Sequence, residues 1–497
     1  TGRPGIMFCT RGPGATNASP GIHIAQQDST PLIVFVGQVG RDMKEREAFQ
    51  ELDYRAVFGT VAKWATEIDD PARIPEIVSR AFYTATSGRP GPVVIALPED
   101  MLRERVSVPD APRYEQVETW PGLTDMAKLQ KLLWAAKQPM ILLGGSRWSE
   151  AACAAVARFA ERFDIPVATS FRRGPLMNAD HPSYAGDLGI GPNPKLLARV
   201  KAADLLVLVG GRLGEMPSQG YTLLDIPTPR QKFVHVHPAV EELGRVYHPR
   251  LGINATPQAF AAALESLQPP NVIPWSKETR QANADFHGWT DVAQPIPGDV
   301  QLGEMALWLR DRLPKDAIIT NGAGNYAIWV SRFLRYHHIG AQLAPVSGSM
   351  GYGVPAAIGA KRLRPDQMVI AFAGDGCFMM HGQEFATAVQ YDIRVIVVIV
   401  DNGMYGTIRM HQEREYPTRI SASTLKNPDF AAYARAFGGH GETVEKTADF
   451  AAAFERAVTA GKPAIIHVKT DAEALTSRIT LTGLREQALE RLRQQKH

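Results

Sequence analysis

The chain has 497 residues, of which 45% are hydrophobic and 21% charged, and its formal net charge is +3. This length is enough for about three domains, and the composition is ordinary for a globular protein. The small net charge and the lack of Lys/Arg runs argue against a nucleic-acid partner, and no apolar run reaches the ~18 residues needed to span a membrane. The three cysteines show neither metal-ligand spacing nor a disulfide framework. We therefore expect a cytoplasmic protein that binds neither nucleic acid nor membrane.

The first part of the chain alternates strand-like and helix-like segments. Apolar strands are predicted at 5–9, 32–36 and 91–98, and a helix is predicted at 73–85. A turn-rich loop at 10–17 follows the first strand and opens a helix. Strands that alternate with helices predict a parallel α/β sheet.

A polar, proline-bearing linker at 106–122 leads into a second α/β unit. Strands are predicted at 139–143, 205–209 and 233–236, with a helix at 151–163. The pattern is Rossmann-like. Glycine pairs follow two of these strands, but they indicate a nucleotide only weakly, because glycine is also the easiest residue to place in a tight turn.

A second linker, rich in proline and polar residues, is predicted at 269–299 and leads into a third α/β unit. This unit starts with a helix at 302–313 and a strand at 317–320. Glycine-rich loops follow at 321–325 and 345–353, and the second of them opens a helix.

The last part of the third unit carries a helix signal, a strand and a tail. Asn427 can cap a helix that has Pro428 at its first position. The strand at 464–468 closes the sheet, and the polar tail from Leu475 onward is helix-prone.

The most informative stretch lies inside the third unit, at 368–404. An apolar strand ends on Gly374-Asp375-Gly376, a helix-like segment follows, and a second apolar strand ends on Asp401-Asn402. Ligands of parallel sheets gather at the carboxyl ends of the strands, where Asp375 and Asn402 both lie. Their oxygens suit Mg²⁺, and the Gly376–Cys377 amides at a helix N-terminus favour a diphosphate.

Several motifs together resemble the thiamine-diphosphate-dependent superfamily of acetolactate synthases, pyruvate oxidases and decarboxylases. They are RGPGATN (11–17), AFQE (48–51), GRPGPVVIALPED (88–100), GSMGYGVPAAIGA (348–360) and the GDG…DN pair. The resemblance runs over nearly the whole chain. It implies an α/β fold of three doubly wound parallel-sheet domains: a pyrimidine-binding domain (1–110), a Rossmann-like central domain (120–268) and a diphosphate- and Mg²⁺-binding domain (298–472). A helical tail (473–497) would follow.

The resemblance also implies the site residues. The metal ligands would be Asp375, Asn402 and the Met404 carbonyl. Met350 would bend the cofactor, and the Gly348 carbonyl would accept a hydrogen bond from its 4′-amino group. The diphosphate loops would be formed by Asn325, Tyr326, Gly348, Ser349, Met350, Gly374, Asp375, Gly376, Cys377, Asn402, Met404, Tyr405 and Gly406. The pyrimidine side, supplied by another subunit of a homodimer or homotetramer, would be lined by Gly12, Pro13, Asn17 and Gln50.

In this family a glutamate of the pyrimidine domain activates the cofactor, and the family pattern places it upstream of Thr1. We expect the sequence to be N-terminally truncated relative to that pattern. A cofactor-binding homologue that lacks the glutamate, and therefore does not catalyse, stays as an alternative.

Some residues indicate the branch of the family. Phe49, Gln50 and Lys63 match substrate-channel positions of acetolactate synthases, and Arg212 matches an arginine there; Lys63 could equally be a surface lysine. Two features differ from that branch: Met410-His411 stands where a Gln-Trp pair is usual, and HVHP (235–238) replaces DIDP. The Met-His-Gly loop that holds FAD is not evident at 186–195, so FAD is doubtful.

The resemblance therefore implies an enzyme dependent on thiamine diphosphate and Mg²⁺. It would decarboxylate a 2-oxo acid and transfer the activated aldehyde to an acceptor, as an acetolactate-synthase-like carboligase does. A non-oxidative 2-oxo acid decarboxylase is the alternative, although the stretch 37–51 lacks the histidines usual in that group. A nicotinamide dehydrogenase is disfavoured because no clean GxGxxG follows a strand. The sequence does not identify the donor or the acceptor.

Overall fold

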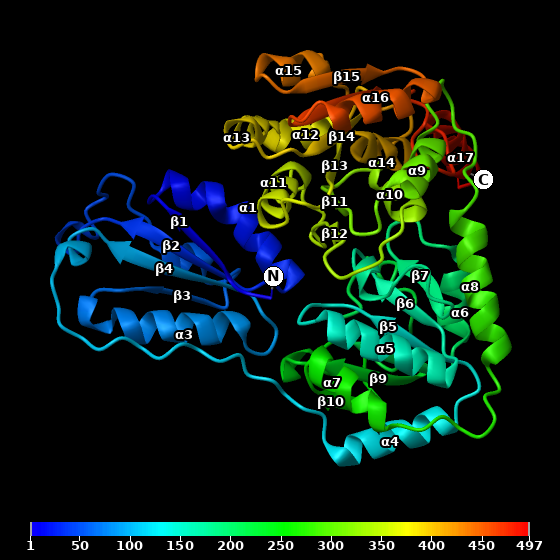
Figure 1. The fold of residues 1–497 in the computed structure, drawn as a ribbon, viewed down its shortest axis with the longest axis horizontal. Helices are drawn as coiled ribbons and strands as arrows, with labels where there is room; N and C mark the ends of the chain where they lie inside the picture. Colours follow the sequence, from blue (N-terminus) through cyan, green and yellow to red (C-terminus); the bar gives the residue numbers. More distant parts are fainter. Residues whose placement is uncertain (1, 496–497) are drawn as a thin grey trace. The chain divides into compact units, whose positions relative to one another are not determined.

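The structure is a computed structural model that describes residues 2–495. These residues form two compact units, one containing residues 2–165 and 200–276 and the other 166–199 and 277–495. Figure 1 shows the chain as α/β throughout, with three parallel sheets covered by helices. The predicted fold class, three parallel-sheet α/β domains, is confirmed.

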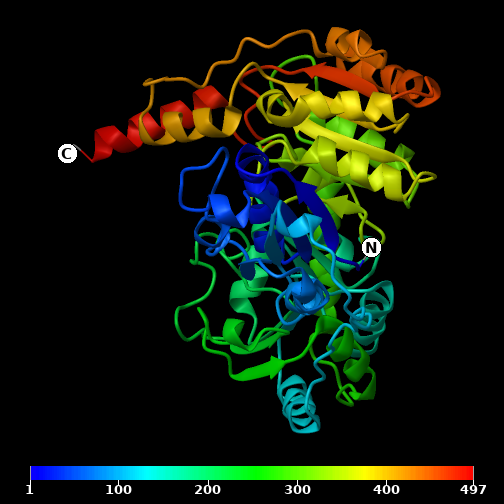
Figure 2. The same ribbon diagram turned by 90° about the vertical axis from the view of Figure 1, so that its left-hand side faces the viewer.

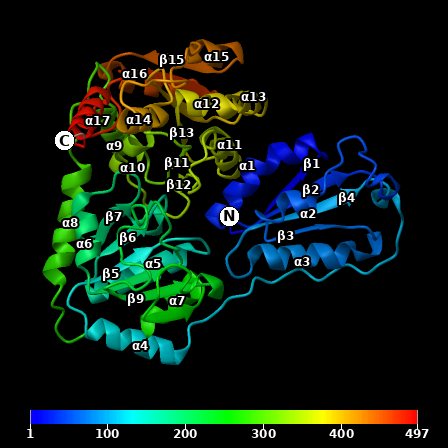
Figure 3. The ribbon, with the colours of Figure 1, turned by 180° about the vertical axis from the view of Figure 1, so that it is seen from behind.

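The N-terminal sheet lies in the first unit, with its strands in the order β1-β2-β4-β3. Neighbouring strands are parallel. Its elements are β1 (Gly5–Cys9), α1 (Pro13–Asp28), β2 (Leu32–Gln38), α2 (Tyr54–Phe58), β3 (Trp64–Glu67), α3 (Ile74–Thr86) and β4 (Pro92–Pro98). Figure 3 shows α1 and α3 on opposite faces of this sheet, so the strands bury apolar side chains on both faces.

The strands of the central sheet are divided between the two units. The first unit contains four of them in the order β10-β9-β8-β5, and the second contains the parallel pair β6 and β7. The elements are α4 (Leu123–Trp134), β5 (Pro139–Leu143), α5 (Glu150–Phe163), β6 (Val167–Ser170), β7 (Tyr184–Leu188), α6 (Pro194–Ala202), β8 (Leu205–Val209), β9 (Lys232–His237), β10 (Leu251–Asn254) and α7 (Pro257–Ala263).

The C-terminal sheet lies in the second unit and has the order β12-β11-β13-β14-β16-β15, all parallel. Its strands are β11 (Ile318–Asn321), β12 (Gln342–Leu343), β13 (Val369–Gly374), β14 (Ile396–Asp401), β15 (His440–Val444) and β16 (Ala464–Lys469). The helices are α8 (Ser276–Thr290), α9 (Leu302–Arg312), α10 (Ala327–Phe333), α11 (Gly353–Leu363), α12 (Asp375–His381), α13 (Phe385–Gln390), α14 (Gly406–Glu415), α15 (Phe430–Ala436), α16 (Thr447–Thr459) and α17 (Leu481–Gln494). Its central strands are nearly continuous apolar runs, because helices bury both faces. Figure 2 shows the C-terminal helix α17 beside α14.

Most predicted strands are present, and β1, β5 and β8 have the predicted bounds. Two expectations were wrong. The linker predicted at 269–299 contains the 15-residue helix α8, whose buried stripe is weakly apolar: Thr279, Ala282, Phe286 and Thr290. The helix near Asn427 is capped instead by Asp429, whose carboxylate accepts from two backbone N–H groups.

Within residues 2–495, no helix combines the length and the apolar character that crossing a bilayer requires.

Candidate functional site

The carboxyl ends of β11, β13 and β14 form one edge of the C-terminal sheet. The strand register places Asn321 opposite Phe372, and Gly374 opposite Val400. The loops that leave this edge therefore begin side by side. They are residues 322–326, the GDG turn and residues 401–406, as the sequence predicted for a ligand site.

Gly322 lies where these loops meet the loop at 345–353. A Cβ atom at Gly322 would overlap the Cys377 sulfur and lie 3.3 Å from the Gly351 nitrogen and 3.4 Å from the Ser349 oxygen. The Cys377 sulfur also accepts a hydrogen bond from the Gly351 N–H, at 3.1 Å. A side chain at Gly322 would therefore force the predicted diphosphate loops apart.

Asp375, a predicted metal ligand, lies close to Asp401, and the side-chain amide of one asparagine bridges the two carboxylates. The Asn427 Nδ2 donates to the Asp375 Oδ2 and to the Asp401 Oδ1, both at 2.8 Å. The Asp401 Oδ2 accepts from His467 Nε2, also at 2.8 Å, and the Gly403 N–H donates to Asp401 Oδ1. Asp401 is therefore held by three donors.

The two carboxylates differ in their electrostatics. Burial, with the nearby Asp401, raises the pKa of Asp375 to about 6, although hydrogen bonds from Gly376 and Asn427 oppose this rise. Burial also acts to raise the Asp401 pKa, but the hydrogen bonds from His467, Gly403 and Asn427 outweigh it and lower that pKa to about 2. Asp375 is thus a buried carboxylate that a bound cation would stabilise.

The other two predicted metal ligands lie on the loop after β14. The Asn402 side chain lies over Gly406, where α14 begins. The Met404 side chain packs in a buried cluster with Leu475, Leu481 and Leu484. This packing anchors the backbone of the loop at Met404. Among residues 2–495, no group of three or more His, Cys, Asp or Glu side chains could hold a metal ion. A cation here would depend on amide and carbonyl oxygens beside Asp375, which is a donor set that suits Mg²⁺.

The remaining diphosphate-side residues are held by local contacts. The Tyr326 hydroxyl accepts from the Gly322 N–H at 3.0 Å and donates to the Phe372 carbonyl at 3.2 Å, so it is engaged inside the loop. The Asn325 Oδ1 accepts from Thr407 Oγ1 at 2.9 Å, which ties the loop to the first turn of α14.

At two further positions of this edge, the surroundings or the backbone conformation favour glycine. A Cβ at Gly376 would lie 2.5 Å from the Tyr405 ring. Gly348 has a φ of +67°, in the left-handed region where glycine is favoured, and the half-buried Met350 packs against the C-terminal core. The Ser349 Oγ lies 3.0 Å from the Ser347 Oγ.

Comparison with known proteins agrees with this geometry. Three family models match: "Thiamine pyrophosphate enzyme, N-terminal TPP binding domain" over residues 1–57, "central domain" over 126–264 and "C-terminal TPP binding domain" over 322–468. The acetolactate synthase large subunit of Parasynechococcus marenigrum is 34% identical over 460 residues, which cover 89% of this chain and 72% of that protein. The chain belongs to the thiamine pyrophosphate enzymes.

Other relatives lead to the same group of these enzymes. The acetolactate synthase isozyme 2 large subunit of Escherichia coli is 30% identical over 477 residues, or 95% of this chain and 85% of that protein. The probable acetolactate synthase large subunit of Methanocaldococcus jannaschii is 30% identical over 495 residues, or 96% and 83%. The chain is thus an acetolactate synthase-like, thiamine-pyrophosphate-dependent enzyme, and the predicted family and enzyme class are confirmed.

In this thiamine pyrophosphate enzyme, the predicted pyrimidine-side residues gather at the start of α1. The Gly12 N–H donates to the Tyr54 hydroxyl at 2.8 Å, and a Cβ at Gly12 would lie 2.9 Å from the Gln50 carbonyl. Pro13 and Asn17 are exposed on the same helix start, and Phe49 beside Gln50 is 76% exposed. The first unit thus presents these five predicted residues from adjacent segments: Gly12, Pro13, Asn17, Phe49 and Gln50.

Lys63 lies apart from this group. It precedes β3, at the amino-terminal edge of the sheet, whereas Gly12 follows the carboxyl end of the parallel strand β1. Its Nζ donates to the Ser87 carbonyl at 2.7 Å. Partial desolvation, with help from nearby arginines, lowers the Lys63 pKa to about 8. The structure does not bring Lys63 together with Gln50 and Phe49.

The donors near the tips of β5, β8 and β9 are engaged with the chain's own carbonyls. Trp148 Nε1 donates to the Gly144 carbonyl at 2.8 Å and His235 Nε2 to the Gly211 carbonyl at 2.8 Å. Arg212 Nη2 donates to the Gln27 carbonyl at 3.2 Å. These three donors are therefore bonded to the backbone of the first unit.

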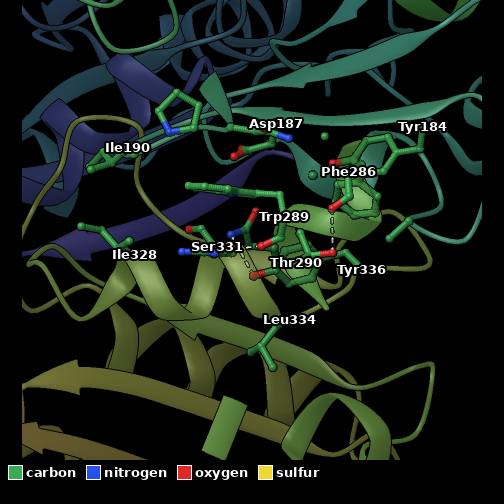
Figure 4. Close-up of a pocket in the computed structure, with 18 residues that line it drawn as sticks. Tyr184, Asp187, Ile190, Phe286, Trp289, Thr290, Ile328, Ser331, Leu334 and Tyr336 are labelled. Carbon is green, nitrogen blue, oxygen red and sulfur yellow. Dashed lines mark hydrogen bonds between the residues drawn. The ribbon is translucent and has the colours of Figure 1, made fainter. Parts of the chain in front are cut away.

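A cavity of about 50 Å³ lies within the second unit (Figure 4). Aromatic side chains surround it, with Tyr184, Phe286, Trp289 and Tyr336 among them. Asp187 also lines it, and burial raises the pKa of that carboxyl to about 7 although the Arg172 charge opposes this. The volume is enough for a few water molecules and too small for thiamine diphosphate.

Sequence reasoning missed three residues of this site. Asp401 was noted only as the neighbour of Asn402, Asn427 was interpreted as a cap, and His467 was not singled out. Each is connected through hydrogen bonds between positions far apart in the chain. No local pattern signals such pairs.

Proposed function

We propose that this enzyme uses thiamine diphosphate and Mg²⁺ to decarboxylate a 2-oxo acid and to transfer the resulting activated aldehyde to an acceptor, as acetolactate synthases do. The observation that carries the proposal is the buried carboxylate of Asp375, whose pKa is raised, at a strand tip beside the strand that leads to Asn402, in a chain whose relatives are named acetolactate synthases.

The cation is held by Asp375, Asn402 and the Met404 carbonyl. A divalent cation beside Asp375 offsets the buried charge and lowers the pKa of that carboxyl. Asn427 keeps the carboxylates of Asp375 and Asp401 at a fixed spacing. The Gly376–Cys377 backbone amides would hold the diphosphate, whose charge a cation at this site would neutralise.

When bound, thiamine diphosphate supplies the carbon nucleophile and stabilises the carbanion left by loss of CO₂. The chain's residues bind, bend and shield it. The Gly348 carbonyl would accept from the 4′-amino group, and Met350 would support the bent cofactor. The absence of a side chain at Gly322 lets the loops that would hold the diphosphate pack closely.

The chain acts as a homodimer or homotetramer in which the pyrimidine-side residues of one copy serve the cofactor held by another. This follows from the family rather than from any contact within the chain. Phe49 and Gln50 line the substrate path, and Lys63, at the other edge of the same sheet, does not belong to it. The enzyme works without a flavin: the Met-His-Gly loop that holds FAD in the family is not evident at 186–195, and Trp148, His235 and Arg212 bond to the chain's own carbonyls. The free thiols of all three cysteines fit a reducing cytoplasm.

The test is turnover of ¹³C-labelled pyruvate by the full-length protein with Mg²⁺ and thiamine diphosphate, followed by NMR. Labelled acetolactate is the expected product. Acetaldehyde alone would assign a simple decarboxylase instead. Saturable cofactor binding without any product from pyruvate or a panel of other 2-oxo acids would assign the non-catalytic alternative. The purified protein should also show no flavin absorbance near 450 nm, and a bound flavin would refute that part of the proposal.

A further inference from the structure

Residues 322–326, the GDG turn and the loop at 345–353 lie close together near Gly322. A side chain from outside the C-terminal sheet contacts two of these loops. A Cβ added at Gly322 would overlap the sulfur of Cys377, which follows the GDG turn, and would lie 3.4 Å from the Ser349 carbonyl of the 345–353 loop. The carbonyl of Gly322 and the carbonyl of Pro345 lie on the two loops that meet there. Each carbonyl accepts one local hydrogen bond, Gly322 from the Asn321 Nδ2 at 2.9 Å and Pro345 from the Gly348 N–H at 3.0 Å. Both also accept from a single arginine, which links the two loops.

That arginine is Arg172, which follows strand β6 of the central sheet and is 4% exposed. Its Nη2 donates to the Gly322 carbonyl at 2.7 Å, and its Nη1 donates to the Pro345 carbonyl. The two loops are separated by more than twenty positions in the chain, yet one rigid guanidinium contacts both. Arginine suits this task because its donors are fixed in a planar fork.

The base of Arg172 is itself held in place. Its backbone N–H donates to the Asp187 carboxylate of β7. Its Cζ lies 4.8 Å from the centre of the Phe171 ring, and its φ of +57° is an uncommon value for a residue with a side chain. The guanidinium therefore extends from a backbone that is held in place, which restricts its movement.

We propose that Arg172 is a positioning residue for thiamine diphosphate: by bonding the carbonyls of Gly322 and Pro345, it sets the spacing of the two loops that hold the cofactor. This inference rests on the proposed function, which assigns loops 322–326 and 345–353 to the cofactor. The two guanidinium bonds to these loops are made to backbone carbonyls, so the proposed role of Arg172 is to position the loops and not to take part in the chemistry.

The consequence of losing the guanidinium follows from burial. Two carbonyls would lose their charge-assisted donor inside the protein. Each would keep its local donor, Asn321 Nδ2 or the Gly348 N–H, but the bonds that join one loop to the other through the guanidinium would be gone, so the two loops could move apart. Asn325 lies on one loop and Met350 on the other, so relaxation would separate residues predicted to contact one cofactor molecule. Cofactor affinity should fall more than the affinity for the 2-oxo acid.

The experiment compares Arg172→Met, Arg172→Lys and Arg332→Met. Arg332 is the matched control, because it is also buried in the second unit and donates to a carbonyl, that of Trp289 at 2.9 Å, without touching the cofactor loops. Binding of thiamine diphosphate with Mg²⁺ is measured by quenching of tryptophan fluorescence. Thermal unfolding of each variant is measured in parallel.

We expect Arg172→Met to weaken cofactor binding by roughly ten-fold or more, the scale found for residues that orient a ligand's direct contacts. Arg172→Lys should recover part of this loss, since one donor can still reach one carbonyl. Arg332→Met should lower the unfolding temperature but leave cofactor affinity within about two-fold of wild type.

Unchanged cofactor affinity in a folded Arg172→Met, or in Arg172→Lys if the former does not fold, would overturn the proposal. An equal loss of affinity in Arg332→Met would also overturn it, since the effect would then be general destabilisation. Failure of the wild-type protein to bind thiamine diphosphate would instead refute the proposed function on which this inference rests.

Discussion

The sharpest test of the proposed cation site is removal of the Asn427 amide. Both hydrogens of one nitrogen serve the two acidic side chains, Asp375 and Asp401, at 2.8 Å each. Asn427→Ala removes both donors and leaves the carboxylates facing each other without a bridge. Asp375 would then be free to turn away from the position at which it meets the cation.

The size of the effect can be worked out from these two bonds. A hydrogen bond to a charged group contributes about 1.5–3 kcal/mol, and 1.4 kcal/mol corresponds to ten-fold in affinity. If the bond to Asp375 alone is linked to cation binding, affinity falls by roughly 10- to 100-fold, which is also the range for residues that orient metal ligands. Asn427→Asp should cost more stability at pH 8 than at pH 5, because a third ionised carboxylate joins the pair.

The assay is titration with Mn²⁺, followed by electron paramagnetic resonance, in the presence of thiamine diphosphate. Asn283→Ala is the control, because the Asn283 Nδ2 also donates twice, to the His181 carbonyl at 3.2 Å and the Tyr184 carbonyl at 3.0 Å. It should lose stability without losing Mn²⁺ affinity. Wild-type Mn²⁺ affinity in a folded Asn427→Ala would refute the reasoning.

Three further predictions concern other buried groups. Burial raises the pKa of Asp187 from 3.8 to about 7, so the folded chain keeps a proton that the unfolded chain releases, and stability falls as pH rises from about 4 to 7. In urea unfolding, the free energy of unfolding of Asp187→Asn should therefore exceed that of wild type at pH 8, by at most about 4 kcal/mol (three pKa units), but should not exceed it at pH 4. A difference that does not change with pH would contradict this. The Glu413 carboxylate is fully buried and accepts from Arg485, which joins α17 to α14, and these bonds lower its pKa to about 2. Glu413→Gln should lower the free energy of unfolding by about 3–5 kcal/mol at pH 7, and wild type should lose this contribution as pH falls from about 4.5 to 2. An unchanged melting temperature in Glu413→Gln would be evidence against a stabilising Glu413–Arg485 pair. Gly376→Ala would place a methyl group 2.5 Å from the Tyr405 ring, so cofactor affinity should fall, and a titration that matches wild type would show that the turn can adjust.

Some features of the fold could be predicted because they are local in the chain. The strands around the GDG turn are apolar runs of the right length, and glycine marks the turn between strand and helix. Since the carboxyl ends of neighbouring parallel strands share an edge, sequence alone placed Asp375 and Asn402 together. Helix α8 was missed for the complementary reason: its buried stripe includes two threonines, so its composition looks like that of a linker.

The sequence by itself determined the α/β class, the cofactor edge and the family, because each depends on periodicity or on motifs that are contiguous in the chain. Only the tertiary structure decided which distant groups complete that edge. Asn427 lies 52 positions from Asp375, His467 lies 66 from Asp401, and Arg172 lies 150 from Gly322. It also separated Lys63 from Gln50 by placing them at different edges of one sheet. Hydrogen bonds between such positions form only where strand order and register bring their backbones together, and no local pattern of residues encodes that order.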